Sequence, residues 1–241
     1  MTFFLLRLKS YPIYEQLLLE EKLLRSGKDN WCLINEGSSP AIVMGISGKK
    51  EELVDCQKAV KDKIPLIKRF SGGGTVVVDE DTLFITFICQ KTLHSFPSYP
   101  EPIMRWAETL YKEAFDHPEF SLKENDYVLG NKKCGGNAQY IRKERWLHHT
   151  SFLWDYSEER MQTLLHPKKT PSYRAMRPHT EFLHRLKDSF PCKNTCIENC
   201  IRALRNRFQV HPVSLKETLG LYPPLERQST CLLDFFLELQ E

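Results

Sequence analysis

The sequence has little of what marks exported, membrane-spanning or nucleic-acid-binding proteins. Its first apolar run, residues 3–6, ends at Arg7 and is too short for the core of a signal peptide. No later stretch is long enough to span a bilayer. The net charge at pH 7 is only +3, far from the strongly basic character of nucleic-acid-binding domains. We therefore expect no membrane partner and no nucleic-acid partner.

The chain also has no internal repeat and no low-complexity tract. Its 241 residues, of which 41% are hydrophobic and 27% charged, are typical of one globular domain. Eight cysteines without an export signal are interpreted as reduced thiols, which indicates a cytoplasmic protein. We expect a single domain over residues 1–241, with a core of about residues 1–190 and a helical C-terminal segment of about residues 191–241.

Hydrophobic periodicity predicts strands mainly in the first half of the chain and helices mainly in the second. The expected strands cover residues 2–8, 31–35, 41–44, 64–70, 75–78 and 83–89. The expected helices cover residues 10–25, with Ser10 as the N-cap, and residues 51–63, 104–115, 157–165, 181–188 and 195–208. This order favours an α+β fold with a mixed or antiparallel sheet.

The most informative stretch is residues 68–79, KRFSGGGTVVVD, in which three of the chain's 11 glycines stand in a row. Glycine N–H groups can approach a bound anion closely, and Arg69 adds a forked cationic donor suited to phosphate or carboxylate. A Walker loop is excluded because no lysine follows Gly74, and a dinucleotide fingerprint would open a helix rather than a strand. The pattern predicts a basic glycine loop between two strands, with an ordinary turn or bulge as the alternative.

A second glycine-rich stretch, residues 125–139, contains paired lysines and is followed by two adjacent histidines, His148 and His149. Four motifs follow one another between residues 69 and 155: Arg-x-Ser-Gly-Gly-Gly, Asn-Asp, Lys-x-x-Gly-Asn-Ala and His-His. In this order they resemble lipoate–protein ligase A of the biotin/lipoate A/B protein ligase family. The resemblance implies that family's catalytic domain, an α+β fold with a mixed, largely antiparallel sheet flanked by helices.

The resemblance also implies an acyl-AMP-forming ligase. In the family, lipoate attacks the α-phosphate of ATP to give lipoyl-adenylate and pyrophosphate, and the amine of a carrier lysine then takes the acyl group as an amide. ATP with Mg²⁺, and lipoate or octanoate, are the implied cofactors and substrates. The implied partners are lipoyl carrier domains of 2-oxoacid dehydrogenase complexes or the glycine cleavage H protein.

The motif positions assign the candidate site residues. Lys133 is the implied catalytic residue, because the family's lysine contacts the acyl carbonyl and the α-phosphate, whereas Lys132 is expected to be exposed. Asp126 is implied beside the nucleotide, where a carboxylate can hold Mg²⁺, and a turn-forming role is the alternative. The implied ATP- and adenylate-binding residues are Arg69, Gly72, Gly73, Gly74, Thr75, Asp126, Asn137 and Ala138.

Two further positions are assigned to the acyl pocket. Strand alternation lets only one of His148 and His149 face the site, and the motif register favours His149. Lipoate ligases commonly carry a histidine where this chain has Val78, and valine cannot donate a hydrogen bond. The acyl preference is therefore open between lipoate, octanoate and another medium-chain acid.

The enzyme class has alternatives as well. The resemblance runs almost to the end of the chain, so no separate accessory domain is expected, and activation could need a partner protein. An octanoyl- or lipoyltransferase without ATP chemistry would carry the acyl group on a thiolate. Cys134 is the candidate, because the cationic neighbours around Lys133 would lower the pKa of its thiol. Cys192, Cys196 and Cys200 recur at helical spacing and are interpreted as a helix face rather than a metal site. A non-catalytic acyl- or carrier-binding protein of the same fold is the second alternative.

Overall fold

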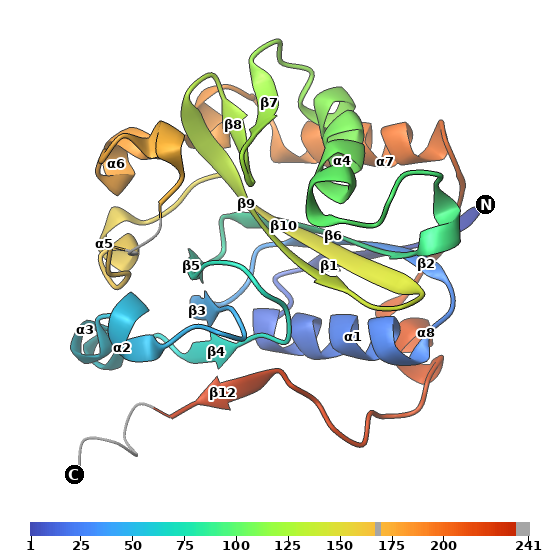
Figure 1. Cartoon of the computed structure of the whole chain (residues 1–241), viewed down its shortest axis with the longest axis horizontal. Helices are drawn as coiled ribbons and strands as arrows, with labels where there is room; N and C mark the ends of the chain where they lie inside the picture. The colour runs from blue at the N-terminus through green and yellow to red at the C-terminus, as the bar shows by residue number, and fades with distance from the viewer. Residues whose placement is uncertain (167–169, 235–241) are drawn as a thin grey trace.

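The computed structural model describes residues 1–166 and 170–234. In this part of the chain, eight strands form one sheet and four short strands form a second (Figure 1). The larger sheet has the order β11 (Gln209–Val213), β1 (Thr2–Lys9), β2 (Asn30–Glu36), β6 (Thr82–Gln90), β10 (Arg145–Leu153), β9 (Lys132–Ile141), β8 (Asp126–Leu129) and β7 (Phe120–Lys123). β11, β1 and β2 run parallel, and the other neighbouring strands pair antiparallel. The predicted mixed, largely antiparallel sheet is confirmed.

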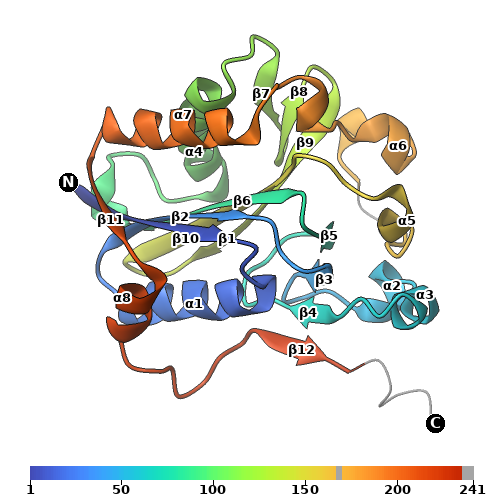
Figure 2. The same ribbon diagram turned by 180° about the vertical axis from the view of Figure 1, so that it is seen from behind.

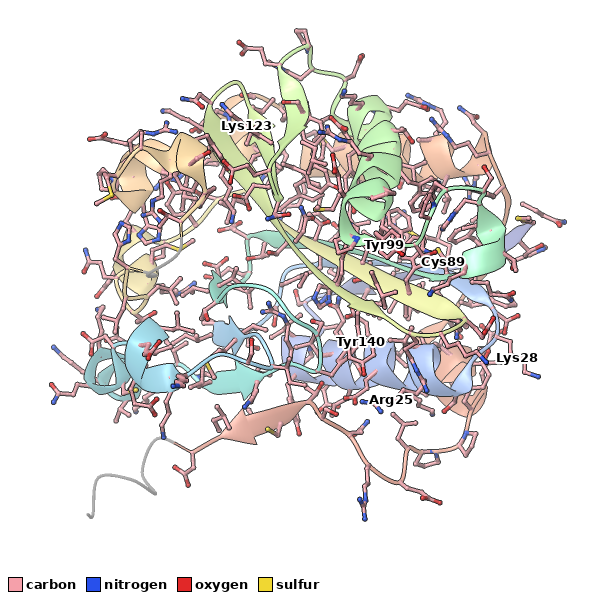
Figure 3. All side chains as sticks on the ribbon, viewed as in Figure 1. Arg25, Lys28, Cys89, Tyr99, Lys123 and Tyr140 are labelled. Atoms are coloured by element: carbon pink, nitrogen blue, oxygen red, sulfur yellow. The ribbon has the colours of Figure 1, made fainter. Side chains whose placement is uncertain are left out.

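Helices cover both faces of the larger sheet, and side chains fill the space between the layers (Figure 3). α4 (Pro100–Phe115) and α7 (Lys193–Arg205) pack on one face, and α1 (Ile13–Ser26) packs on the other (Figures 1 and 2). Side chains of β2 alternate between the two layers, with Cys32 on the α4 side and Trp31 on the α1 side. Because β2 is buried on both faces, its sequence is a continuous apolar run that periodicity identifies easily.

The start of α1 differs from the expectation. The helix begins at Ile13 with Pro12 as its N-cap, so the predicted capping role of Ser10 is wrong. Ser10 has a φ of +51°, because the chain turns sharply there between β1 and α1. The backbone N–H of Ile13 donates instead to the hydroxyl of Ser38, 2.8 Å away in the loop after β2.

The second sheet carries the first glycine loop. Its order is β12 (Cys231–Leu233), β4 (Leu66–Lys68), β3 (Ala41–Met44) and β5 (Val76–Val78). The glycine loop joins β4 to β5, so the predicted strand–loop–strand arrangement is confirmed, with shorter strands than expected. β5 lies at the edge of this sheet, so among the described residues it pairs with a strand on one side only.

The helix predicted over residues 51–63 is wrong as a single element. It is replaced by two short helices, α2 (Lys50–Leu53) and α3 (Cys56–Lys61). Val54 between them is buried and forms an isolated β-bridge with Leu164, and this pairing interrupts the helical hydrogen bonds.

The helical second half is also more irregular than predicted. The helices expected over residues 157–165 and 181–188 are reduced to single helical turns. The short elements of this half are α5 (Glu158–Met161), η2 (Ser172–Arg174), α6 (His179–Phe182) and η3 (Leu186–Asp188). One more short turn, η1 (Lys91–Leu93), follows β6 in the first half.

The C-terminal segment was predicted to be helical, but it also contains two strands. β11 extends the larger sheet beside β1, α8 (Leu215–Gly220) follows, and β12 extends the second sheet beside β4 (Figure 2). Both strands are short and pair with residues in the first third of the chain, so local periodicity does not reveal them. Residues 235–241 of the predicted segment lie outside the described residues. Within residues 1–166 and 170–234, no helix has the length and apolar character needed to cross a membrane.

Candidate functional site

A cavity of about 680 Å³ lies where the larger sheet faces β3 and β5 of the second sheet. Every residue that the motifs predict for the site lines it. These residues are Arg69, Gly72, Gly73, Gly74, Thr75, Val78, Asp126, Lys133, Asn137, Ala138 and His149. The fold thus brings the four motifs together around one space, although their individual roles stay predictions.

Arg69 differs from the expected exposed anion donor. Its side chain is buried, and its guanidinium donates to the carbonyls of Gly72 and Gly74 at 2.8 and 2.7 Å and to the carbonyl of Val43 at 3.2 Å. Its Nε also donates to the Ser71 hydroxyl at 3.1 Å. Burial lowers the pKa of Arg69 to about 10, which leaves it charged at neutral pH. In this structure Arg69 shapes the loop from beneath, because the loop's own oxygens occupy its donors.

The clamp by Arg69 orients the loop's N–H groups. In a trans peptide the C=O of one residue and the N–H of the next point in opposite directions. Since the carbonyls of Gly72 and Gly74 face Arg69, the N–H groups of Gly73 and Thr75 point away from the guanidinium, at positions that line the cavity. The Thr75 hydroxyl is buried and has no protein partner among the described residues. This arrangement is that of an anion-binding concavity.

Gly73 is the loop position that cannot carry a side chain. Its φ is +105°, a conformation that L-residues rarely adopt. A Cβ there would lie 2.7 Å from Nη2 of Arg69 and 3.2 Å from Cβ of Ala138. The loop therefore packs directly on β9 at Ala138.

Lys133 and Asp126 form an ion pair at the cavity. Nζ of Lys133 lies 2.7 Å from Oδ1 of Asp126, and the Tyr173 hydroxyl donates to Oδ2 of the same carboxylate at 2.9 Å. The Lys133 side chain passes over Gly136, where a Cβ would sit 3.4 Å from Nζ. Lys132 is exposed, as expected from alternation along β9. Of the two lysines, Lys133 is the one that faces the cavity.

The second glycine-rich stretch is a hairpin made of β8, a turn at Gly130 and Asn131, and most of β9. Residues 132–141 form β9, with a register irregularity against β8 between Tyr127 and Val128. The side chain of Asn137 donates to the carbonyl of Asn125 and accepts from Thr150. Small residues in β9, such as Ala138, leave room for the first glycine loop to pack against the strand.

A preformed magnesium site does not fit these residues. Both oxygens of Asp126 are engaged, one by a cation. Across the described ranges, no group of three His, Cys, Asp or Glu side chains lies together in a way that could hold a metal. The role of Asp126 toward Mg²⁺ stays a prediction.

The two histidines take opposite faces of β10, as alternation requires. His148 is fully buried, and its ring nitrogens contact Gln139 and Tyr127, while burial lowers its pKa to about 3. His149 lines the cavity instead. Its Nδ1 lies 2.9 Å from Oε2 of Glu20, and its Nε2 lies 3.1 Å from Oγ of Ser71.

One end of the cavity is apolar. Val78 packs in a buried cluster with Ile13, Leu17, Val43 and Phe84, and all five residues line the cavity. All three residues of β5, Val76, Val77 and Val78, line the cavity, so the cavity follows the whole length of this strand. Such a slot suits a hydrocarbon chain.

Sequence reasoning missed Glu20, Tyr173 and Arg174. Arg174 is buried, lines the cavity and stacks its guanidinium 5.0 Å from the centre of the Phe182 ring, while its Nη2 has no hydrogen-bond partner among the described residues. Glu20 had a signal, an acidic pair inside the apolar run of α1. Arg174 and Tyr173 had none, since they lie in an irregular segment outside the four motifs.

The cysteines take structural positions. Cys134 is fully buried, its thiol donates to the carbonyl of Tyr127 at 3.4 Å, and burial raises its pKa well above the ordinary value. The expected lowering of its pKa by cationic neighbours is therefore wrong, because the side chain points into the core and away from Lys133. Cys196 and Cys200 are buried on α7, whereas Cys192 is exposed and precedes the helix. The helix-face interpretation thus fits Cys196 and Cys200.

Comparison with solved structures gives the fold. A crystal structure of lipoate-protein ligase A bound with ATP matches with a TM-score of 0.73 and 20% identity, over 90% of this chain and 91% of that chain. A bipartite lipoate protein ligase from Thermoplasma acidophilum, described with its E2 lipoyl domain, matches with a TM-score of 0.73 and 19% identity, over 90% of this chain and 89% of that chain. At these identities the similarity establishes the fold, which is that of a lipoate-ligase-like catalytic domain.

The family follows from the sequence itself. Residues 12–209 match the model of the lipoyl protein ligase A/B catalytic domain, and the chain belongs to this family. It is 30% identical to the inactive lipoate–protein ligase 2 of Plasmodium falciparum, over 81% of this chain and 67% of that protein. It is 29% identical to the lipoate-protein ligase LplJ of Bacillus subtilis, over 55% of this chain and 39% of that protein. The chain thus spans less than half of the bacterial ligase.

Proposed function

We propose that this chain is a lipoate–protein ligase of the cytoplasm. It converts lipoate or octanoate with ATP into acyl-AMP, then transfers the acyl group to a lysine of a lipoyl carrier domain. The observation that carries the proposal is the Lys133–Asp126 ion pair on the same cavity as the clamped glycine loop. One cavity thereby offers an ammonium group, an anion-binding loop and an apolar slot.

The first half-reaction needs stabilised phosphate oxygens. The acyl carboxylate attacks the α-phosphorus, a P–O bond forms, and the bond to pyrophosphate breaks. The N–H groups of Gly73 and Thr75 supply fixed donors to the phosphates without reorganisation. Asp126 holds Lys133 over Gly136, so that its ammonium is in place when negative charge develops on the α-phosphate and the acyl oxygen. Mg²⁺ would arrive with the nucleotide, because both oxygens of Asp126 are engaged by Lys133 and Tyr173 in this structure.

The second half-reaction needs an oriented carbonyl and a buried chain. The neutral amine of the carrier lysine attacks the acyl carbon, AMP leaves, and the nitrogen loses a proton. The apolar end around Val78 would hold the hydrocarbon chain and leave the carbonyl near Lys133. The proposed carrier is a lipoyl domain of a 2-oxoacid dehydrogenase or the glycine cleavage H protein. The Thermoplasma ligase described with its E2 lipoyl domain supports this class of partner.

A non-catalytic binding protein is the second candidate, because one relative at 30% identity is named inactive. The intact Lys133–Asp126 pair and the clamped loop favour the enzyme. An ATP-independent transferase is less favoured, since the thiol of Cys134 is buried against Tyr127.

Pyrophosphate release separates these candidates. Purified protein is incubated with ATP, Mg²⁺ and either lipoate or octanoate, without a carrier. The ligase should release pyrophosphate in proportion to enzyme, and the acid should be required. No release with either acid, alone or with carrier added, would favour the binding protein.

A further inference from the structure

Two adjacent glutamates of α1 are buried in different surroundings. Glu20 and Glu21 both have no exposed surface. Oε1 of Glu20 accepts from the Gln16 amide at 2.8 Å and from the Thr86 hydroxyl at 2.7 Å. Its Oε2 faces Nδ1 of His149 at 2.9 Å. Burying a carboxyl group is costly without such partners, and here both oxygens of Glu20 have them.

From Glu20 a chain of hydrogen bonds runs into the first glycine loop. Nε2 of His149 lies 3.1 Å from Oγ of Ser71, the residue that precedes the three glycines. The same Oγ accepts from Nε of Arg69, whose Nη2 holds the carbonyls of Gly72 and Gly74. Glu20 is therefore linked through two side chains to the clamp that orients the loop.

The carboxylate sets the direction of these bonds. A carboxylate only accepts, so Nδ1 of His149 carries a hydrogen. With a neutral imidazole, Nε2 then accepts the hydroxyl hydrogen of Ser71, which leaves the Ser71 oxygen free to accept from Arg69. Each donor in the chain has one acceptor in this arrangement.

The order Ser71–His149–Glu20 is also that of a hydrolase triad, but its chemistry does not fit one. Ser71 has no exposed surface and is not among the residues that line the cavity. Its oxygen already accepts a hydrogen bond from a cation. The chain therefore positions the loop and does not supply a nucleophile.

We propose that Glu20 is a positioning residue: through His149 and Ser71 it holds the first glycine loop in the conformation that presents the N–H groups of Gly73 and Thr75 to the cavity. As regards the nucleotide, this inference rests on the proposed function. The order of the loop in the ligand-free protein does not depend on it.

The test compares Glu20→Gln with Glu21→Gln in ligand-free protein. Glu21 takes no part in the chain of hydrogen bonds from Glu20 to the loop: it accepts from the N–H groups of Ser229 and Thr230 and pairs with Arg25. Glu20→Gln should lower the ¹⁵N order parameters of Gly72 to Gly74 from about 0.85 to below about 0.6. It should also speed hydrogen exchange of the Ile46 amide, which donates to the Ser71 carbonyl, by about tenfold or more. Glu21→Gln should speed exchange at Ser229 and Thr230 only.

Two more readouts separate positioning from general destabilisation. The glutamine amide can donate to Nδ1, so the ¹⁵N spectrum of His149 should change from the Nδ1–H to the Nε2–H tautomer. Ser71→Ala, which breaks the far end of the chain, should loosen the same loop residues. The double variant should then show little additional effect. If Glu20→Gln unfolds, Ser71→Ala alone must give the local change.

The outcomes distinguish this inference from the proposed function. Loop order parameters and Ile46 exchange at wild-type values in both Glu20→Gln and Ser71→Ala would overturn it. If wild-type protein binds ATP, Glu20→Gln should raise the Kd for ATP about tenfold or more, whereas Glu21→Gln should leave this Kd unchanged. Wild-type protein that binds no ATP would instead overturn the proposed function, and the loop measurements would still decide the role of Glu20.

Discussion

The Lys133 ammonium lies 2.7 Å from the Asp126 carboxylate, on the inner edge of a cavity that both residues line. The two residues come from neighbouring strands, β9 and β8, and Tyr173 from the irregular segment after β10 fixes the carboxylate from its other side. The pair thus keeps a partly buried lysine at the cavity, beside the place where the proposed function puts the phosphate and acyl oxygens.

Lys133→Ala should lower carrier lipoylation at least a hundredfold. This corresponds to about 3 kcal/mol of transition-state stabilisation, the usual scale for removing one charge-stabilising group. Lys132→Ala is the matched control, because Lys132 is exposed on the other face of β9, and it should lose much less. Wild-type rates for Lys133→Ala would end its assignment as the catalytic residue.

Gly73→Ala should abolish tight ATP binding, whereas Gly72→Ala and Gly74→Ala should be tolerated better. An alanine at Gly73 would have to adopt a φ of +105°, and its Cβ would lie 2.7 Å from Nη2 of Arg69. A Cβ at Gly72 or Gly74 meets no atom within 4 Å. Isothermal titration with ATP measures the three variants side by side. Equal losses at all three positions would show that the Arg69 clamp does not set the loop's shape.

The motifs predicted the site better than the chain's irregular parts. Every site residue predicted from the motifs lines the cavity, because each motif lies in or beside a strand of the two sheets. Arg69 was predicted to face an anion, but the loop's own carbonyls are nearer to its donors. The role of Glu20 could not be predicted from the acidic pair alone, since Thr86 and His149, two of its partners, are far away in the sequence. Arg174 lies in an irregular segment outside the four motifs.

The same distinction holds for the fold. β2 and β6 are buried on both faces and were predicted from their apolar runs. β11 and β12 were missed because each is stabilised by pairing with a distant strand rather than by its own pattern. The helix expected around Val54 failed for a similar reason, since the tertiary bridge to Leu164 replaced the local hydrogen bonds.

Cys134 should be inert in the native protein. Its thiol is buried and its pKa raised by burial, whereas Cys192 is exposed and hydrogen bonds from Thr195 lower its pKa. Iodoacetamide at neutral pH, followed by peptide mass spectrometry, should modify Cys192 early and Cys134 last. Cys134→Ser should remain active. An ATP-independent acyl adduct trapped on Cys134 would favour the transferase instead.

Octanoate should compete with lipoate to within about a hundredfold in kcat/KM. Val78 offers no hydrogen-bond donor, and differences of shape alone in an apolar pocket contribute only about 1–3 kcal/mol. Val78→His should sharpen the preference for one acid without abolishing activity. A one-pot competition, read from the masses of the two acylated carriers, measures both. A wild-type preference for lipoate beyond about a thousandfold would contradict the placement of Val78 in the acyl pocket.

His148 should make the protein less stable in mild acid. Burial holds its pKa at about 3 in the folded chain, below the ordinary value of 6.5, so the unfolded chain binds the proton more readily. Its contribution is fully present above pH 6.5 and is lost as the pH falls from 6.5 toward 3. At pH 5 the loss is up to about 2 kcal/mol. Denaturant unfolding at pH 7 and pH 5 should show a smaller pH effect for His148→Gln, and equal pH effects would contradict this.

The most direct test of the proposed function is the mass of a carrier domain after incubation with this protein. A lipoyl domain of a 2-oxoacid dehydrogenase is mixed with the protein, Mg²⁺, ATP and lipoate or octanoate, and each component is omitted in turn. We expect one acyl group on the carrier lysine only when both ATP and the acid are present, and none with Lys133→Ala. Acylation that needs no ATP, or an unmodified carrier under every condition including octanoate, would contradict the ligase.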